Sequence, residues 1–192
     1  MTGHASATLI GNLHVETDGT ADNSGDAVKT FVDANIQITP QSATNPISTN
    51  HTLTGHVNVN TGTGGCVNAP NGTTITFAIV SGPGSFVGAS SCTTFGGTGS
   101  CSAVISSSAT GTTTIKASTD ATVGGVTLHR AGGDGKAGYS TNASKAWAAA
   151  KIAIASSATN EVGQSYTFTV TLSKDTGPAR LSPRPASTSA SR

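Results

Sequence analysis

Three cysteines are the residues of this sequence with the most specific chemistry. Cys92 and Cys101 flank a short turn in which glycines at positions 96, 97 and 99 allow the chain to reverse tightly. If both cysteines enter neighbouring antiparallel strands, their Cα atoms lie roughly 4.5–5.5 Å apart, within the span of about 4.4–6.8 Å that a disulfide requires. Cys66 lies in a different loop, so its approach to either of the others depends on tertiary packing. We predict a Cys92–Cys101 disulfide and a free Cys66.

The predicted disulfide closes a short loop, which in the chain-entropy description stabilises a fold by only about 2–3 kcal/mol. We therefore expect the bond to hold one hairpin in place rather than the whole domain. A zinc site would need four nitrogen or sulfur ligands, and this cysteine spacing does not supply them.

Carboxylates near the start of the chain form a second candidate site. Asp18, Asp22 and Asp26 are spaced four apart with hydroxyl side chains between them, and alternating oxygen ligands are what Ca²⁺ prefers. The spacing lacks the glycine at the sixth position of an EF-hand loop. A solvated hairpin loop is therefore the interpretation that we favour, and we predict no metal and no cofactor.

Histidines and catalytic motifs give no further site. His51 and His56 are five residues apart on an expected strand, so their side chains point to opposite faces and cannot share a metal ion. The sequence contains no Gly-x-Ser-x-Gly, no His-Glu-x-x-His and no phosphate-binding loop with its lysine. We predict that the protein is not an enzyme.

Hydrophobic alternation defines the elements that would carry these residues. In residues 73–80 Ile75, Phe77 and Ile79 are large and apolar, whereas the residues between them are small or polar, which is the period of a half-buried strand. Gly82, Pro83 and Gly84 then force a turn. Further strands are expected near 50–60, 101–107, 111–119, 125–130 and 145–154, with a short one near 85–88. Many short strands separated by turns predict an all-β antiparallel sandwich.

The stretch from about residue 51 to residue 117 resembles the bacterial immunoglobulin-like domains of the invasin and intimin type. The resemblance rests on the Gly-Pro-Gly turn, on Cys101-x-Ala103-x-Ile105, and on Ala-Thr-Gly-Thr-Thr-Thr-Ile-Lys-Ala at 109–117. The family's usual Asp-x-x-Gly is replaced here by Asn-Thr-Gly-Thr at 60–63. The resemblance implies an immunoglobulin-like sandwich and a role as a repeated spacer in a surface protein.

The chain also contains an internal repeat with a period of 115 to 116 residues. Aligning residues 29–57 with residues 145–172 places Phe31 on Trp147, Ile36 on Ile152 and Leu53 on Phe168. Upstream, Leu-His at 13–14 falls on Leu-His at 128–129. This period slightly exceeds the roughly 100 residues of an immunoglobulin-like domain.

The repeat divides the chain into four parts. Residues 1–40 are expected to end a preceding immunoglobulin-like repeat, 41–155 to form one complete sandwich, 156–174 to begin a following repeat, and 175–192 to be a disordered tail. The segments 39–46 and 155–161 would be linkers. Because both partial repeats lack their own partner sheets, we expect them either to be disordered or to self-associate through unpaired edge strands.

The predicted core of the complete repeat is aliphatic and light in aromatic side chains. Trp147, the single tryptophan, is expected at one rim of the sandwich. The predicted core residues are Leu53, Val57, Val59, Ile75, Phe77, Ile79, Phe86, Ile105, Ile115, Ala117, Val126, Leu128, Ile152 and Ile154.

Composition limits the classes of function. The 192 residues include only 10% charged residues with a net charge of +1, so there is no basic surface for nucleic acid or an anionic membrane. Abundant Gly, Ser and Thr with few Lys and Glu favour an extracellular or cell-surface β-protein. We therefore predict a non-catalytic structural or adhesive repeat module, with neighbouring repeats as partners and an unidentified host or matrix receptor. The alternative is a carbohydrate-binding accessory module of a secreted enzyme, which would need exposed aromatic side chains.

Overall fold

A computed structural model describes residues 1–9, 13–20, 22–155, 158–175 and 182–186 of the chain. Every regular element in these residues is a β-strand, and nearly all of the strand pairs are antiparallel. Two packed sheets form the centre of the molecule, which confirms the predicted all-β sandwich. No helix long and apolar enough to cross a membrane occurs in the described part of the chain.

The first sheet of the sandwich has the strand order β10-β12-β7-β5, with β8 also paired to β7. Its longest strand alternates Leu53, Val57 and Val59, which are buried, with polar residues that face outward. This alternation places one face of the sheet on the core. The strands are β5 (Asp33–Thr39), β7 (His51–Asn60), β8 (Val67–Asn68), β10 (Ser85–Phe86) and β12 (Ser100–Ser106).

The second sheet has the order β11-β9-β13-β15, with β14 paired to β13 and β6 paired in parallel to β15. Its central strand, β13, is longer than predicted because the inward alternation of small and apolar residues continues through Ala121 and Val123. The strands are β6 (Ser42–Pro46), β9 (Thr74–Ser81), β11 (Ser91–Thr93), β13 (Gly111–Val123), β14 (Val126–Ala131) and β15 (Ala143–Ile154).

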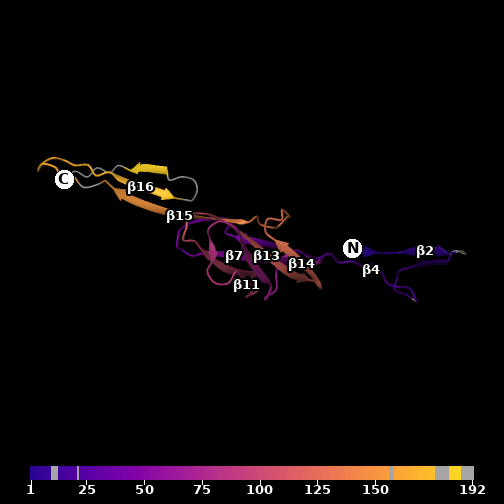
Figure 1. Ribbon diagram of the computed structural model, residues 1–192. Helices are drawn as coiled ribbons and strands as arrows, with labels where there is room; N and C mark the ends of the chain where they lie inside the picture. Colours follow the sequence, from indigo (N-terminus) through magenta and orange to yellow (C-terminus); the bar gives the residue numbers. More distant parts are fainter. Residues whose placement is uncertain (10–12, 21, 156–157, 176–181, 187–192) are drawn as a thin grey trace.

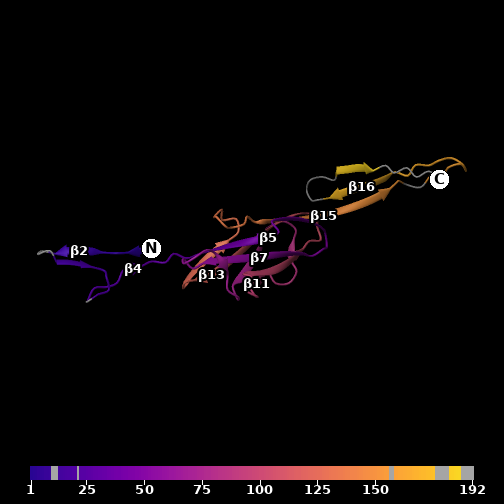
Figure 2. The ribbon, with the colours of Figure 1, turned by 180° about the vertical axis from the view of Figure 1, so that it is seen from behind.

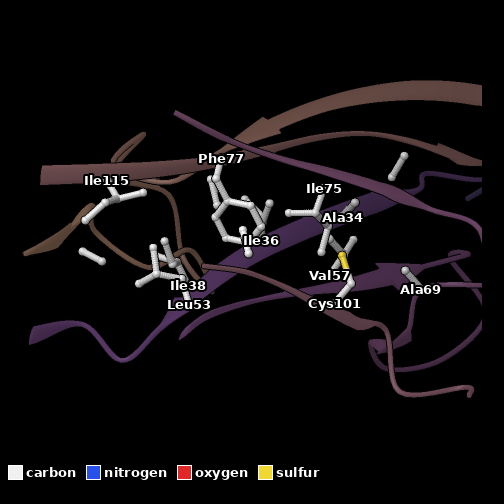
Figure 3. Packing of buried hydrophobic residues seen from close by; sticks show 14 of the residues in the cluster. Ala34, Ile36, Ile38, Leu53, Val57, Ala69, Ile75, Phe77, Cys101 and Ile115 are labelled. Carbon is white, nitrogen blue, oxygen red and sulfur yellow. The ribbon is translucent and has the colours of Figure 1, made fainter. Parts of the chain in front are cut away.

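The core lies between the two sheets (Figure 3). Ile36, Leu53 and Val57 of the first sheet face Ile75 and Phe77 of the second, and all are buried. Gly55 of the first sheet lies against Ile75 and Phe77 of the second. A Cβ atom there would lie 2.8 Å from Cγ2 of Ile75 and 3.1 Å from Cζ of Phe77, so only glycine fits between Leu53 and Val57.

The sandwich begins upstream of the boundary expected at residue 41. Strand β5 pairs with β7 along its whole length, and its residues Ala34, Ile36 and Ile38 are buried in the core. The segment expected as a linker at 39–46 contains β6, which pairs with β15. An alignment of repeats fixes the period but not the residue at which one fold unit begins, because that is decided by which strands pair.

Three predictions about burial on β15 are corrected. Trp147 is not at a rim but fully buried, whereas Ile152 and Ile154 are 72% and 63% exposed. The strand leaves the sandwich after Ala148, so its last six residues have no sheet facing them. Val126, on β14, is also exposed, because it lies at the tip of the β13–β14 hairpin.

Two ribbons extend from the sandwich at opposite ends (Figures 1 and 2). The N-terminal ribbon comprises β1 to β4, in which β1 pairs with β4 and β2 with β3. The C-terminal ribbon comprises residues 149–154 of β15 paired with β16. The bounds are β1 (Thr2–Gly3), β2 (Ser6–Leu9), β3 (Leu13–Glu16), β4 (Ala27–Val28) and β16 (Val170–Asp175).

The tail expected to be disordered is described only at residues 182–186. These residues form β17 (Ser182–Ala186), which pairs with β16 and therefore departs from the prediction. The rest of that prediction, at 176–181 and 187–192, lies outside the described residues.

Candidate functional site

The predicted disulfide is present between Cys92 and Cys101, and its Cα atoms are 5.9 Å apart. Its structural role differs from the one expected. Cys92 lies on β11 opposite Ile75 of β9, whereas Cys101 lies on β12 opposite Gly55 of β7. The bond therefore joins the two sheets of the sandwich instead of closing a two-stranded hairpin. Cys66 is free and exposed.

The aspartates of the N-terminal ribbon are held by separate partners. The Asp18 carboxylate accepts hydrogen bonds from the backbone N–H and hydroxyl of Thr20 and from the Asn23 amide, and these bonds lower its pKa. The Asp26 carboxylate accepts a hydrogen bond from the Thr17 hydroxyl at 2.8 Å. Within the described residues no three His, Cys, Asp or Glu side chains gather in a way that could hold a metal ion.

His4 is the second partner of Asp26 and lies 2.8 Å from its carboxylate. This hydrogen bond, with the negative charge of Asp26, raises the pKa of His4. The contact joins the β1 end of the ribbon to the residues that precede β4, and its strength depends on protonation of the imidazole. The His4–Asp26 pair is exposed to solvent, so it contributes little to the stability of the ribbon.

The two central histidines lie on opposite faces of β7, as their spacing predicts. His56 faces outward and contacts Ser100 at 2.7 Å and Asn58 at 3.0 Å. His51 shares the inward face with Leu53 at the end of the core. Burial lowers the pKa of His51, and the nearby positive charge of Lys145 lowers it further.

Lys145 is a buried cation that the sequence analysis did not identify. It lies on the inward face of β15 between Ala143 and Trp147, where its ammonium group donates to the Asn45 side chain and lies 5.3 Å from the Trp147 ring. The Trp147 indole N–H in turn donates to the Thr113 hydroxyl at 3.0 Å. These contacts fix β15 to both β6 and β13 at the point where the strand leaves the sandwich.

Lys145 could have been found from its position in the alternation. It is two residues from Ala143 and two from Trp147, so a strand that buries both must also bury Lys145. Burial lowers the pKa of its ammonium group because the charged form loses solvation.

A polar groove of about 280 Å³ on the outer face of the second sheet contains the pair His129 and Asp120, which lie 2.7 Å apart. Ser118 lies in the same groove, but its hydroxyl donates to the Thr76 carbonyl rather than to the imidazole. The His129–Asp120 pair is highly exposed and screened by water. The groove therefore lacks the histidine-to-hydroxyl contact that an activated serine requires.

Trp147 and Tyr139, two of the aromatic side chains considered for sugar binding, are engaged elsewhere, whereas Phe31 and Phe95 are exposed. Trp147 is fully buried, and the Tyr139 hydroxyl donates to the Ala34 carbonyl at 2.9 Å. Tyr166 and Phe168 pack edge to face with ring centroids 4.9 Å apart, so they do not form a flat platform.

The two terminal ribbons are the most distinctive surfaces of the molecule. In the C-terminal ribbon, Ile152 pairs with Leu172 and Ile154 with Val170. In the sandwich, Ile36 pairs with Val57 and Ile38 with Gly55. A shift of 116 residues along the first strand and 115 along the second superposes the two registers, and all six pairs of the β15–β16 ladder coincide with pairs of β5–β7.

The N-terminal ribbon repeats another part of the sandwich in the same way. Thr2 pairs with Val28, as Thr114 pairs with Ser144 in the β13–β15 ladder. Farther along the ribbon, β2 and β3 repeat the β13–β14 ladder, with Thr8 opposite His14 as Asp120 is opposite His129.

No protein-family model and no curated protein sequence matches the chain.

Proposed function

We propose that the protein is a non-catalytic structural module that works in series with like modules of a surface or secreted protein. In such a series the last strand of each immunoglobulin-like sandwich continues as the first strand of the next. The observation that carries the proposal is the shared pairing register: the C-terminal ribbon repeats β5–β7, and the N-terminal ribbon repeats β13–β14 and β13–β15.

The connection between successive modules would be stiff. Strand β15 runs without interruption from the buried Ala143 to the exposed Ile154, so a single strand spans the junction. At about 3.3 Å per residue, this strand covers roughly 40 Å. The Thr110 hydroxyl also donates to the Asp175 carboxylate at 3.1 Å, which ties β16 to the sandwich. Such a joint suits a spacer whose purpose is to hold a fixed length.

The disulfide supports placement in an oxidising compartment outside the cytoplasm, where such bonds persist. The carbohydrate-binding alternative is weakened because Trp147 is buried and the Tyr139 hydroxyl is engaged with Ala34. The polar side chains described above form hydrogen bonds with neighbouring side chains and backbone, as expected for a structural role.

A covalent tandem tests the proposal. Residues 1–148 are joined directly to residues 33–192 of a second copy, so that Asp33 takes the place of Ala149. We expect two complete sandwiches in line, two disulfides, about twice the calorimetric unfolding enthalpy, since that enthalpy scales with folded residues, and a longer maximum dimension in small-angle X-ray scattering.

The matched control joins residue 148 to residue 34 instead. Deleting one residue from the shared strand turns the second sandwich to the opposite side of that strand, so this tandem should lose the in-line arrangement and have a shorter maximum dimension. Equal behaviour of the two tandems, or aggregation of the in-register one, would refute the proposal.

A further inference from the structure

The C-terminal ribbon has an apolar face that nothing in the described structure covers. Ile152, Ile154 and Leu172 lie on this face and are 72%, 63% and 52% exposed. Their counterparts Ile36, Ile38 and Val57 are completely buried in the sandwich. Among the described residues, one edge of 149–154 also lacks a strand partner, because β16 occupies the other edge and the pairing with β6 ends at Ala148. Exposed edges and apolar faces of this kind favour association.

The sandwich shows how such a ribbon is covered. Strands β13 and β14 and the loop after them lie against β5. Arg130 Nε and the Tyr139 hydroxyl both donate to the Ala34 carbonyl at 2.9 Å. The backbone N–H of Ile38 donates to the Ser140 hydroxyl at 2.8 Å, and the Ser140 N–H donates to the Ile36 carbonyl. Residues 130–140 thus satisfy the free edge of β5.

The chain carries a second version of this covering segment in its N-terminal ribbon. Strands β2–β3 have the register of β13–β14, so Val15 stands in place of Arg130 and Ser24, one residue of the loop after β3, in place of Ser140. Leu13, the counterpart of Leu128, is 58% exposed, whereas Leu128 packs against the core. The N-terminal ribbon repeats the strands that cover β5–β7 but has no such ladder beneath it. The C-terminal ribbon repeats the β5–β7 ladder but has no covering strands.

The two ribbons of one molecule cannot meet, because they project from opposite ends of the sandwich (Figures 1 and 2). We propose that the N-terminal ribbon of one copy docks on the apolar face of the C-terminal ribbon of a second copy, as β13–β14 docks on β5–β7. The contact is head to tail, so it extends into open chains of molecules unless the geometry closes a ring.

Charge favours this pairing over two N-terminal ribbons together. Residues 1–28 contain Glu16, Asp18, Asp22 and Asp26 but no lysine or arginine, so two such ribbons repel each other. The C-terminal ribbon instead carries Lys174 on the same face as Leu172. An acidic segment therefore meets a face that has a cation beside its apolar residues.

One difference between the two ribbons is compatible with this occupant. Val170 stands where the sandwich has Gly55, a position from which Ile75 and Phe77 of β9 exclude any side chain. Residues 1–28 contain no counterpart of β9. The bulk of Val170 therefore meets no such obstacle in the head-to-tail contact.

Two single variants of the full chain provide the test. Leu13→Lys places a charge on the docking face of the N-terminal ribbon, and Ile152→Lys places one on the apolar face of the C-terminal ribbon. Both positions are exposed, so neither change should alter the thermal unfolding of the sandwich. Sedimentation velocity is run from roughly 1 μM to roughly 1 mM, the span in which weak protein contacts dissociate.

We expect the wild-type protein to form species larger than a dimer as its concentration rises, and each variant alone to remain a monomer. An equimolar mixture should form a one-to-one dimer, because Leu13→Lys retains a good C-terminal ribbon and Ile152→Lys a good N-terminal one. Ala153→Lys, an exposed change on the opposite face of the same strand, is the control and should assemble like the wild type.

Other results overturn the proposal. Self-association of Leu13→Lys alone means that two C-terminal ribbons pair, self-association of Ile152→Lys alone means that two N-terminal ribbons pair, and a wild-type monomer throughout means that neither end docks. The inference rests on the proposed function for its matching of strands. A correctly folded tandem with a wild-type monomer would reject the docking alone, whereas failure of the in-register tandem would reject the repeat itself.

Discussion

The β5–β7 ladder of the sandwich and the β15–β16 ladder of the C-terminal ribbon share a pairing register, but only the first is covered by a second sheet. In the sandwich, β5–β7 presents Ile36 and Ile38 to a facing sheet and buries them completely. In the C-terminal ribbon, Ile152 and Ile154 occupy the same register and remain mostly exposed. Strand pairing is therefore reproduced without the core, which separates the contribution of the ladder from that of sheet-on-sheet packing.

We expect side-chain burial to contribute more than strand pairing to the difference in stability between these two ladders. Burying an isoleucine fully is worth about 1.5–3 kcal/mol, whereas a backbone hydrogen bond contributes a net of only about 0.5–1.5 kcal/mol. The C-terminal ribbon has three strands, residues 149–154, β16 and β17, but its apolar face is uncovered, so it gains little from side-chain burial. Matched substitutions in the two copies turn this difference into measurements.

Trp147 and Phe31, which occupy equivalent positions of the repeat, should differ most in the loss of unfolding free energy on truncation to alanine. Trp147→Ala should destabilise the sandwich by about 3–5 kcal/mol, because it opens a cavity and removes the hydrogen bond to Thr113. Phe31, its counterpart, is 66% exposed, so Phe31→Ala should change stability by less than about 0.5 kcal/mol. Urea unfolding followed by circular dichroism measures both, and similar losses would erase the distinction between the two copies.

The isoleucine pair is expected to show the next largest difference. Ile36→Ala should cost about 2–5 kcal/mol, the range for truncating a fully buried aliphatic side chain. Ile152→Ala should change the unfolding free energy of the sandwich by less than about 0.5 kcal/mol. Thermal unfolding in dilute solution is the measurement, and a loss of more than 1 kcal/mol for Ile152→Ala would show that the ribbon is part of the cooperative unit.

The inter-sheet disulfide is a third difference, because it cross-links the sandwich and neither terminal ribbon. Replacing both Cys92 and Cys101 with alanine should destabilise the sandwich by about 2–3 kcal/mol. Cys66→Ser, at the exposed free thiol, is the control and should have no effect. An unchanged unfolding free energy in the double variant would mean that the two sheets are already fixed by packing alone.

The smallest effect concerns pH and the lysine pair Lys145 and Lys29. Burial lowers the pKa of Lys145 in the folded protein, so between that pKa and the unfolded value of about 10.4 the unfolded chain binds more protons. Stability from Lys145 therefore rises with pH across this window and is absent at neutral pH. Lys145→Met should remove the rise, whereas Lys29→Met, at the exposed counterpart, should retain it.

The measurement is thermal unfolding at several alkaline pH values, taken as the difference between each variant and the wild type. Tyr139 also has a raised pKa, mainly because of burial, but it is present in all three proteins and its effect cancels. Equal pH slopes for the wild type and Lys145→Met would contradict the assignment.

Local patterns in the sequence predicted much of the sandwich. The alternation at Ile75 and Phe77 and the turn at Gly82 gave strands close to the observed ones, and the glycines between Cys92 and Cys101 led to the correct disulfide. The predictions that failed concerned tertiary structure. The disulfide joins two sheets, and the strand that contains Trp147 leaves the core after Ala148, because pairing partners far apart in the chain decide both outcomes.

The repeat illustrates the same limit. Matching Ile36 with Ile152 was visible in the sequence, but identical residues in identical registers differ in burial according to which other strands are present. No pattern within residues 149–175 predicts that Ile152 is exposed, because burial depends on covering strands from other parts of the chain. Lys145 was missed for a related reason, since composition suggested a surface lysine and only its phase between Ala143 and Trp147 indicates burial.

Amide hydrogen exchange in dilute solution measures how much the covering sheet stabilises strand pairing. We expect amides in the β5–β7 ladder to exchange only through global unfolding, whereas those in the matching β15–β16 ladder open with a free energy near zero. The comparison is made position by position, with Ile36 against Ile152 and Ile38 against Ile154. Equal protection of the two ladders would mean that the covering sheet does not stabilise strand pairing in β5–β7.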